Sequence, residues 1–304
     1  MKSVVAVLVS DVHLSEKAPV ARSAEPDWFA AMARPLVELR AVADEHSAPI
    51  ICGGDIFDRW NPRPPLVNFA LDHLPEMYAI PGQHDLANHN YQDIEQTAYW
   101  TLCKAGVLSN LNPKFPVHGG RSGKIILHAF PWGHPITPRM NDEAGPRYLN
   151  VAVCHQYVWT KKSGGYPGAD PDARIDQMGE QLAGYDAVLF GDNHKGFQTS
   201  VGGCSVMNPG TFMRRKQDER AYRPMIGLLL EDGTIEPHYL DTDDDKFTDR
   251  EDVIEIPELD AAEFIDSLRG LDADSLDFRE VVRTRLNSEE ASDAVRKLVM
   301  ESVG

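Results

Sequence analysis

The stretch Ala48-Pro-Ile-Ile-Cys-Gly-Gly-Asp55-Ile-Phe-Asp58 indicates how this chain is organised. An apolar run ends there at Gly-Gly-Asp, and a second carboxylate follows three residues later. A short apolar run bounded by glycines is typical of a buried strand. Ligands of open α/β sheets bind at the carboxyl ends of the strands, so we expect Asp55 to face a binding site rather than bulk solvent.

The same pattern, an apolar run followed by polar side chains that can take part in chemistry, occurs four more times. The runs are 4–10, 77–81, 149–154 and 187–190. The polar residues that follow them are, in order, Asp11 and His13; Gln83, His84 and Asp85; His155; and Asp192, Asn193 and His194. Oxygen donors mixed with imidazoles, without a thiolate, suit Mn, Fe or Zn. The sequence therefore predicts a metal site where five strand ends meet.

The segments between these runs predict a parallel sheet. Helical periodicity marks 27–46, 65–74 and 93–105, with Asp27 as the N-cap of the first helix. Strands that alternate with helices in this way form parallel sheets with right-handed crossovers. Further strands are predicted at 124–130, 202–206, 225–231 and 235–240, and Asp232-Gly233 predicts a hairpin turn between the last two.

Charge divides the chain into two unequal parts. Of the net charge of −17, residues 241–304 carry −12, from 20 acidic and 8 basic side chains, which leaves −5 for residues 1–240. The acidic run 241–245 has the composition of a linker. We therefore predict a main domain at 1–240 and a small domain at 241–304. The small domain would contain strands and helices at 252–256, 260–268, 279–286 and 288–302.

Composition also restricts the class of protein. No apolar run reaches the roughly 20 residues of a membrane span, and residues 1–10 lead straight into Asp11, so we interpret them as a strand and not a signal peptide. The four cysteines lack CxxC spacing, which is typical of a reducing compartment. We expect a cytoplasmic protein without membrane contact. The sequence has no basic patch, which argues against tight nonspecific DNA binding by this chain alone.

Taken together, the motifs resemble those of the calcineurin-like metallophosphoesterase superfamily. Each motif alone arises by chance, but the ordered set at the ends of five apolar runs is specific. The resemblance implies a metal-dependent hydrolase with a four-layer α/β/β/α core, followed here by a small C-terminal α+β cap. The set consists of Asp11-x-His13, Gly54-Asp55-x-x-Asp58, Gly82-x-His84-Asp85, an isolated His155 and Gly191-x-x-His194.

A narrower resemblance, to the SbcD-type DNA repair nucleases, covers essentially the whole chain. It rests on Gly-Asp-Ile-Phe-Asp58, His155-Gln156, and Asn208-Pro-Gly-Thr211 with Arg214 after it. It implies an exonuclease or endonuclease for single- or double-stranded DNA, an SbcC-type ATPase partner, and a homodimer formed through the helices at 65–74 and 93–105. Since the sequence ends at Gly304, we expect the C-terminal segment that docks on the ATPase in that family to be absent.

The resemblance also implies two metal positions. Two divalent cations are expected, Mn before Mg, Fe or Zn, and together they activate a water for attack on phosphorus. Asp55 would bridge them. The first cation would be held by Asp11, His13, Asp55 and His194, and the second by Asp55, Gln83, His155 and Asp192.

Further residues would assist the metal ligands. By the resemblance His84 would act on the leaving oxygen and Asp85 would orient His84. Asp58 would accept a hydrogen bond from a ligand imidazole. His89 and Arg214 are candidates for substrate binding, with a solvated loop histidine and a solvated basic pair as the alternatives.

Two positions depart from the family pattern, and both belong to the second cation. The family usually has Asn where this chain has Gln83, and His where it has Asp192. The change makes the site richer in hard oxygen donors, which favours Mn or Mg over Zn, or it leaves the site weak or empty. Three functions stay open: a DNA phosphodiesterase, a phosphoesterase for nucleotides or other small esters, and a noncatalytic adaptor with a degraded second metal site.

Overall fold

A computed structural model describes residues 2–114, 116–119, 125–139, 148–166 and 169–248. The chain divides into two compact units, Met1–Val253 and Ile254–Gly304. The strands and helices predicted for the small domain, 252–302, lie outside the described residues. Within the described part of the chain, no helix is long and apolar enough to cross a membrane.

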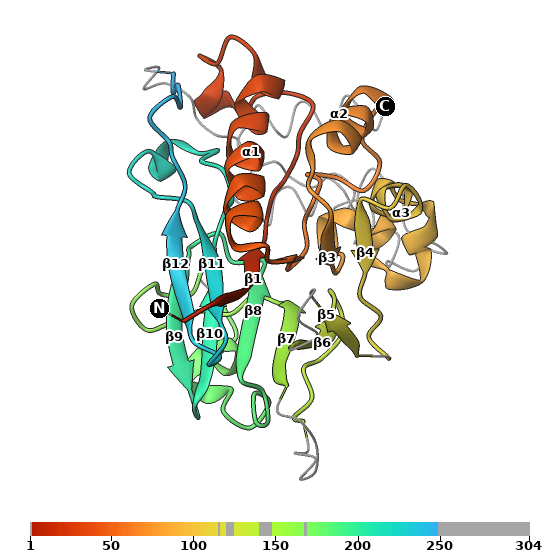
Figure 1. The fold of residues 1–304 in the computed structure, drawn as a ribbon. Helices are drawn as coiled ribbons and strands as arrows, with labels where there is room; N and C mark the ends of the chain where they lie inside the picture. Colours follow the sequence, from red (N-terminus) through yellow and green to blue (C-terminus); the bar gives the residue numbers. More distant parts are fainter. Residues whose placement is uncertain (1, 115, 120–124, 140–147, 167–168, 249–304) are drawn as a thin grey trace, which may run out of the picture. The chain divides into compact units, whose positions relative to one another are not determined.

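The described strands of the first unit form two six-stranded sheets (Figure 1). The first sheet contains, in spatial order, β12 (Ile235–Tyr239), β11 (Met225–Leu230), β1 (Val4–Val9), β2 (Ile50–Cys52), β3 (Met77–Ala79) and β4 (Leu108–Asn110). The second contains β5 (Val117–Gly119), β6 (Ile125–Phe130), β7 (Leu149–His155), β8 (Ala187–Gly191), β10 (Cys204–Asn208) and β9 (Phe197–Val201).

Parallel pairing dominates the centre of each sheet, as predicted. β1, β2, β3 and β4 pair in parallel, and so do β6, β7, β8 and β10. Antiparallel strands β11, β12, β5 and β9 lie toward the edges. The central strands therefore end at a common rim in each sheet, which is where the polar motifs lie.

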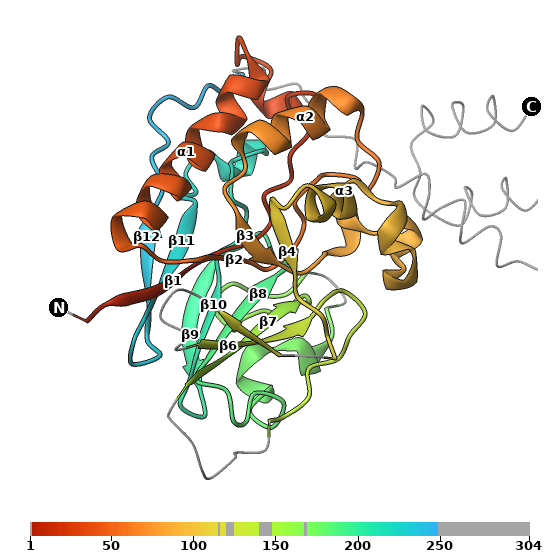
Figure 2. The same ribbon diagram turned by 45° about the vertical axis from the view of Figure 1, so that its right-hand side comes forward.

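The core has three apolar layers. Side chains of both sheets, among them Leu8, Ile51, Val151 and Leu189, form one buried cluster, so the sheets pack face to face. Helices α1 (Trp28–His46), α2 (Pro64–His73) and α3 (Ala98–Lys104) cover the outer face of the first sheet (Figure 2). Among the described residues, the outer face of the second sheet is covered by loops and short 3₁₀ helices, including Pro171–Ala173 and Ile175–Gln177.

The α/β class with two sheets is thus confirmed, and the predicted helix starts are largely correct. Asp27 caps α1 by accepting a hydrogen bond from the Ala30 amide at 3.1 Å. The hairpin at Asp232-Gly233 joins β11 to β12. Pro64 lies at the first position of α2, where its missing N–H costs nothing.

Two local predictions were wrong. The helix predicted at 93–105 is a 3₁₀ helix, Tyr91–Gln96, followed by α3, because Thr97 caps a new helix by accepting from the Trp100 amide. The strand predicted at 202–206 lies at Cys204–Asn208, because Gly202 and Gly203 have positive φ and form the turn from β9. β9 itself was missed.

The acidic run at 241–245 is attached to the main unit. Asp245 lies 2.5 Å from the buried Arg22 guanidinium and 2.9 Å from that of Arg214. Phe247 stacks under the same arginines, and the Thr248 amide donates to the Ala21 carbonyl. The charge of this run is therefore partly neutralised within the first unit.

Candidate metal centre

The predicted metal ligands gather at one rim, between the carboxyl ends of the central strands of the two sheets. Three overlapping groups have donor atoms that lie within 4.8 Å of one another. These groups are Asp11, His13 and His194; His13, Asp55 and His84; and Asp11, Asp55 and His155. Asp192 joins them because its amide donates to Asp11 Oδ1 at 3.0 Å. Segments up to 183 residues apart therefore supply a single site.

Backbone strain is concentrated at this rim. Asp11, His13, Asp55 and Asp192 all have positive φ, from 48° to 85°, which non-glycine residues adopt at a cost of about 1–3 kcal/mol each. The turns after β1, β2 and β8 thus hold these side chains in place at the expense of stability. Gly82 shows how closely the turns approach, since a Cβ there would lie 2.0 Å from Asp55 Oδ1.

The first half of the site consists of two imidazoles and two carboxylates. His13 Nε2 lies 3.0 Å from His194 Nε2, and each nitrogen is 3.8 Å from Asp11 Oδ1. His13 Nε2 is also 3.5 Å from Asp55 Oδ2. Two imidazole nitrogens at this distance cannot both carry a proton, so at least one presents a lone pair, and with both protons on Nδ1 the two lone pairs could bind one cation.

The second half contains Gln83 and Asp192, the two residues for which the resemblance led us to expect other side chains. Gln83 Nε2 donates to Asp192 Oδ1 at 2.8 Å, so these side chains form a pair. His155 Nε2 lies 3.4 Å from Asp55 Oδ2, and Asp192 is close enough to His155 for their charges to interact. The donor set on this side is therefore carboxylate, amide oxygen and imidazole.

Three atoms of the site that could bind a metal are buried and have no hydrogen-bond partner among the described residues. They are Asp55 Oδ2, Gln83 Oε1 and His155 Nε2. Leaving such atoms unpaired is costly, and native proteins usually do so where an ion or a water completes the site. Since all three belong to predicted ligands, the residues present are suited to holding divalent cations. Gln83 in particular has its carbonyl oxygen free.

Neighbouring backbone groups fix the tautomers of the histidines. His155 Nδ1 lies 2.6 Å from the Gly53 carbonyl and His84 Nδ1 lies 3.1 Å from the Asp58 carbonyl, so each Nδ1 carries the proton and donates it. Nε2 of His155 is thereby left as a lone pair for a cation, as in many metal sites.

Burial and mutual charge perturb the carboxylates strongly. Burial, with the nearby Asp55 charge as a further contribution, raises the pKa of Asp11 to about 7. Burial would also raise the pKa of Asp55, but the charge of the nearby His155 outweighs it, and the pKa of Asp55 falls below its usual range. His155 shows the reverse balance, because burial disfavours its charged form while Asp55 raises its pKa to about 10. A cation that binds here would displace protons.

The Asp58 carboxylate lies on the side of the His13 ring that faces away from the Asp11 and Asp55 donor atoms, next to Nδ1. Its Oδ1 is 3.6 Å from His13 Nδ1 and 2.7 Å from Nη1 of Arg215. Burial acts to raise the pKa of Asp58, but the His13 imidazole and the Arg215 charge together lower it well below its usual value. Sequence reasoning did not find the Arg215 contact, because the two residues are 157 positions apart in the chain.

Asp85 differs from the expectation that it orients His84. Its buried carboxylate accepts hydrogen bonds from the amides of Ile56, Phe57 and Gly82, each at 3.1 Å. These bonds join the turn after β2 to the turn after β3. The described residue that contacts the His84 ring nitrogen is Asp58, through its carbonyl, while the His84 amide donates to Asp55 Oδ1. Asp85 acts on the site through the backbone.

Arg214 also differs from its predicted role in substrate binding. Its guanidinium donates to Asp245 Oδ2 and to the carbonyls of Arg220 and Thr242, at 2.7–2.9 Å. These donors are used in holding residues 242–245, which makes the arginine structural. His89, in contrast, is exposed beside Trp132, whose ring in turn packs edge-on to His155, so His89 lies at the rim.

The Asn208-Pro-Gly-Thr211 turn supports the loop that carries His194. Asn208 Nδ2 donates to the carbonyls of Asn193 and Lys195, and the Thr211 amide donates to the His194 carbonyl. These bonds fix the backbone on both sides of His194. The motif therefore positions a ligand and does not contribute one.

Two stacked sheets with such a donor cluster at their common rim fit a metal-dependent hydrolase. Residues 5–196 match the sequence profile of the calcineurin-like phosphoesterases, which is more than half of the chain. The chain belongs to this family and is a hydrolase. A comparison of the sequence with curated proteins found no match.

Among solved structures, the chain is similar to an archaeal phosphodiesterase and to a putative 5′-nucleotidase from Staphylococcus aureus. The first is 13% identical, with 79% of this chain and 100% of that chain covered and a TM-score of 0.40. The second is 12% identical, with 86% of this chain and 58% of that chain covered and a TM-score of 0.42.

Proposed function

We propose that the protein is a metal-dependent phosphodiesterase that cleaves DNA, with Mn as its cation. The observation that carries the proposal is the donor cluster around Asp55, in which buried acceptor atoms of three predicted ligands have no hydrogen-bond partner within the described part of the chain. Two bound divalent cations would supply an activated water and neutralise charge on the phosphate. DNA as the substrate follows from the whole-chain resemblance to SbcD-type nucleases.

The protein's own side chains would do the remaining work. Asp11, His13, Asp55 and His194 would hold one cation, and Asp55, Gln83, His155 and Asp192 the other. His84, whose Nδ1 contacts the Asp58 carbonyl, would present Nε2 and hold a proton for the leaving oxygen. The oxygen-rich second half supports Mn or Mg over Zn.

The net charge of −17 favours a second candidate, a phosphoesterase for nucleotides or other small esters. Such substrates carry fewer charges than DNA and are repelled less by an acidic surface. An SbcC-type partner, and a dimer through α2 and α3, stay predictions from the resemblance.

The test compares hydrolysis of linear double-stranded DNA, single-stranded DNA and bis-p-nitrophenyl phosphate in Mn. We expect DNA cleavage, and a loss of about 10²- to 10⁴-fold in turnover for His84→Ala. The matched control is His46→Ala, at the far end of α1. Cleavage of the small ester alone would favour the second candidate. Absence of turnover on all three, with about one metal per chain, would contradict both and indicate a noncatalytic adaptor.

A further inference from the structure

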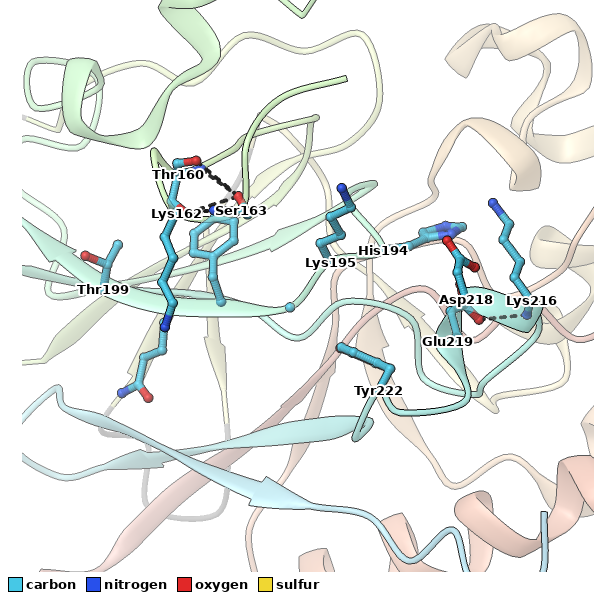
Figure 3. Close-up of a pocket in the computed structure, with 13 residues that line it drawn as sticks. Thr160, Lys162, Ser163, His194, Lys195, Thr199, Lys216, Asp218, Glu219 and Tyr222 are labelled. Carbon is cyan, nitrogen blue, oxygen red and sulfur yellow. Dashed lines mark hydrogen bonds between the residues drawn. The ribbon is translucent and has the colours of Figure 1, made fainter. Parts of the chain in front are cut away.

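A groove of about 710 Å³ opens beside the metal centre and shares His194 with it. Three lysines from three separate loops line it: Lys162 from the loop after β7, Lys195 from the turn between β8 and β9, and Lys216 from the loop after β10. We call it the lysine groove. In the view of Figure 3, His194 lies between the side chains of Lys195 and Lys216, and Lys162 lies toward the other end.

The three lysines are exposed, and among the described residues none of them forms an ion pair. Their neighbour Lys161 is different, because its ammonium lies 3.2 Å from Asp176. The acidic side chains of the groove are Asp218 and Glu219. Glu219 is already engaged, since its Oε2 accepts from the amides of Arg215 and Lys216. Three lysines and two carboxylates leave the groove with a net charge of +1, in a protein whose net charge is −17.

The backbone beneath each lysine is held by side-chain hydrogen bonds. Thr160 and Ser163 bond to each other's amides at 2.9 and 3.0 Å, which closes the turn that carries Lys162. The Lys195 amide donates to Asn193 Oδ1 at 3.0 Å, and Glu219 caps the turn at Lys216. The backbone at each lysine is therefore fixed, while its long side chain extends from the turn. Such a surface attracts anions without losing charge to internal pairs.

We propose that the lysine groove binds the phosphates that flank the scissile phosphate in a nucleic-acid strand. Pockets of about 300–1,000 Å³ accept ligands much larger than a single phosphate group, and Lys ammonium groups bind phosphates as point charges without reading the base. A strand whose scissile phosphate lies at His194 would continue along the groove. The inference rests on the proposed DNA phosphodiesterase activity and explains how an acidic protein binds a polyanion.

The experiment measures KM for a labelled single-stranded oligonucleotide in Mn over a range of NaCl concentrations. Lys162→Ala, Lys195→Ala, Lys216→Ala and the triple variant are compared with Lys161→Ala, one residue outside the groove. Each groove variant should reduce the salt dependence, the slope of log KM against log [NaCl], by about 0.7, and the triple variant by about 2. For the triple variant, the loss in kcat/KM for DNA should exceed the loss for bis-p-nitrophenyl phosphate at least about tenfold. Lys→Arg variants should keep the wild-type slope.

The outcomes separate this inference from the function on which it rests. If DNA is cleaved but the groove variants behave like Lys161→Ala, the lysine groove does not bind the strand and the nuclease proposal stands. Equal losses on DNA and on the small ester would assign the lysines to the metal centre and overturn the inference. If the wild-type protein cleaves only the small ester, both proposals fail.

Discussion

The two halves of the metal centre share Asp55 but differ in how their ligands are held. In the first half, two imidazoles and Asp11 face one another, and Asp58 with Arg215 lies behind His13. In the second half, Gln83 and Asp192 are bonded to each other at 2.8 Å before any cation is considered. In the first half, a residue outside the ligand set contacts the ligand His13. In the second half, the Gly53 carbonyl holds His155 in a similar way, but Gln83 and Asp192 hold each other. This difference indicates that Gln83 and Asp192 depend on each other for their positions.

The largest effect on metal binding and turnover is expected from a substitution of Asp55, which belongs to both halves. Asp55→Asn keeps the shape of the side chain but removes the charge shared by both cations. We expect loss of both cations and a fall in turnover greater than the roughly 10- to 100-fold that loss of an outer partner costs. Metal content after dialysis and hydrolysis of bis-p-nitrophenyl phosphate measure this. Asp176→Asn, a surface carboxylate paired with Lys161, is the control. A variant that retained two cations would show that the halves do not share Asp55.

A smaller effect, confined to one half, is expected from Asp58→Asn. The change weakens the contact behind His13 and leaves the Arg215 guanidinium without its charge partner. The affinity of the first cation should fall about 10- to 100-fold, while the second is changed much less. Calorimetric titration with Mn measures both steps. Asp245→Asn, which removes a similar partner from Arg214 outside the site, should leave both affinities near wild type. Equal weakening of both steps would contradict the division into halves.

The sequence predicted where the site lies better than it predicted which residues contact and orient the ligands. Asp11, Asp55 and His155 could be placed because each ends an apolar run, and the ends of parallel strands meet at one rim. Which of two adjacent arginines faces the site could not be predicted. It depends on how the chain leaves the turn after β10, and the outcome is that Arg214 binds Asp245 while Arg215 binds Asp58.

The role of Asp85 could not be predicted from the sequence for a similar reason. Its position beside His84 suggested a side-chain contact, but its three hydrogen bonds go to amides of Ile56, Phe57 and Gly82. Two of these partners lie almost thirty residues away in the chain. A carboxylate that satisfies the backbone of two turns leaves no local periodicity by which to recognise it. Motifs therefore predicted ligands, whereas tertiary contacts decide what orients them.

The smallest effect, and the one that best tests the contrast between the halves, is expected from substitutions of Gln83 and Asp192. Asp192→His alone removes the carboxylate that accepts the hydrogen bond from the Gln83 amide, and Gln83→Asn alone shortens the side chain that donates it. Each single substitution should therefore lower the affinity for the second cation. Histidine tolerates the positive φ at position 192 better than most residues. The double variant, which restores the usual family residues, should recover binding and shift the preference from Mn toward Zn about tenfold.

The measurement is a double-mutant cycle on metal affinity, with Mn and Zn titrated in competition with a chromophoric chelator. A coupling energy of about 0.5–3 kcal/mol is expected for side chains in direct contact. The thermal unfolding temperature of each variant checks that the fold is intact. Additive effects would mean that the hydrogen bond between Gln83 and Asp192 does not link their roles. In that case the second half would be organised like the first, by contacts outside its own ligands, and the contrast between the halves would disappear.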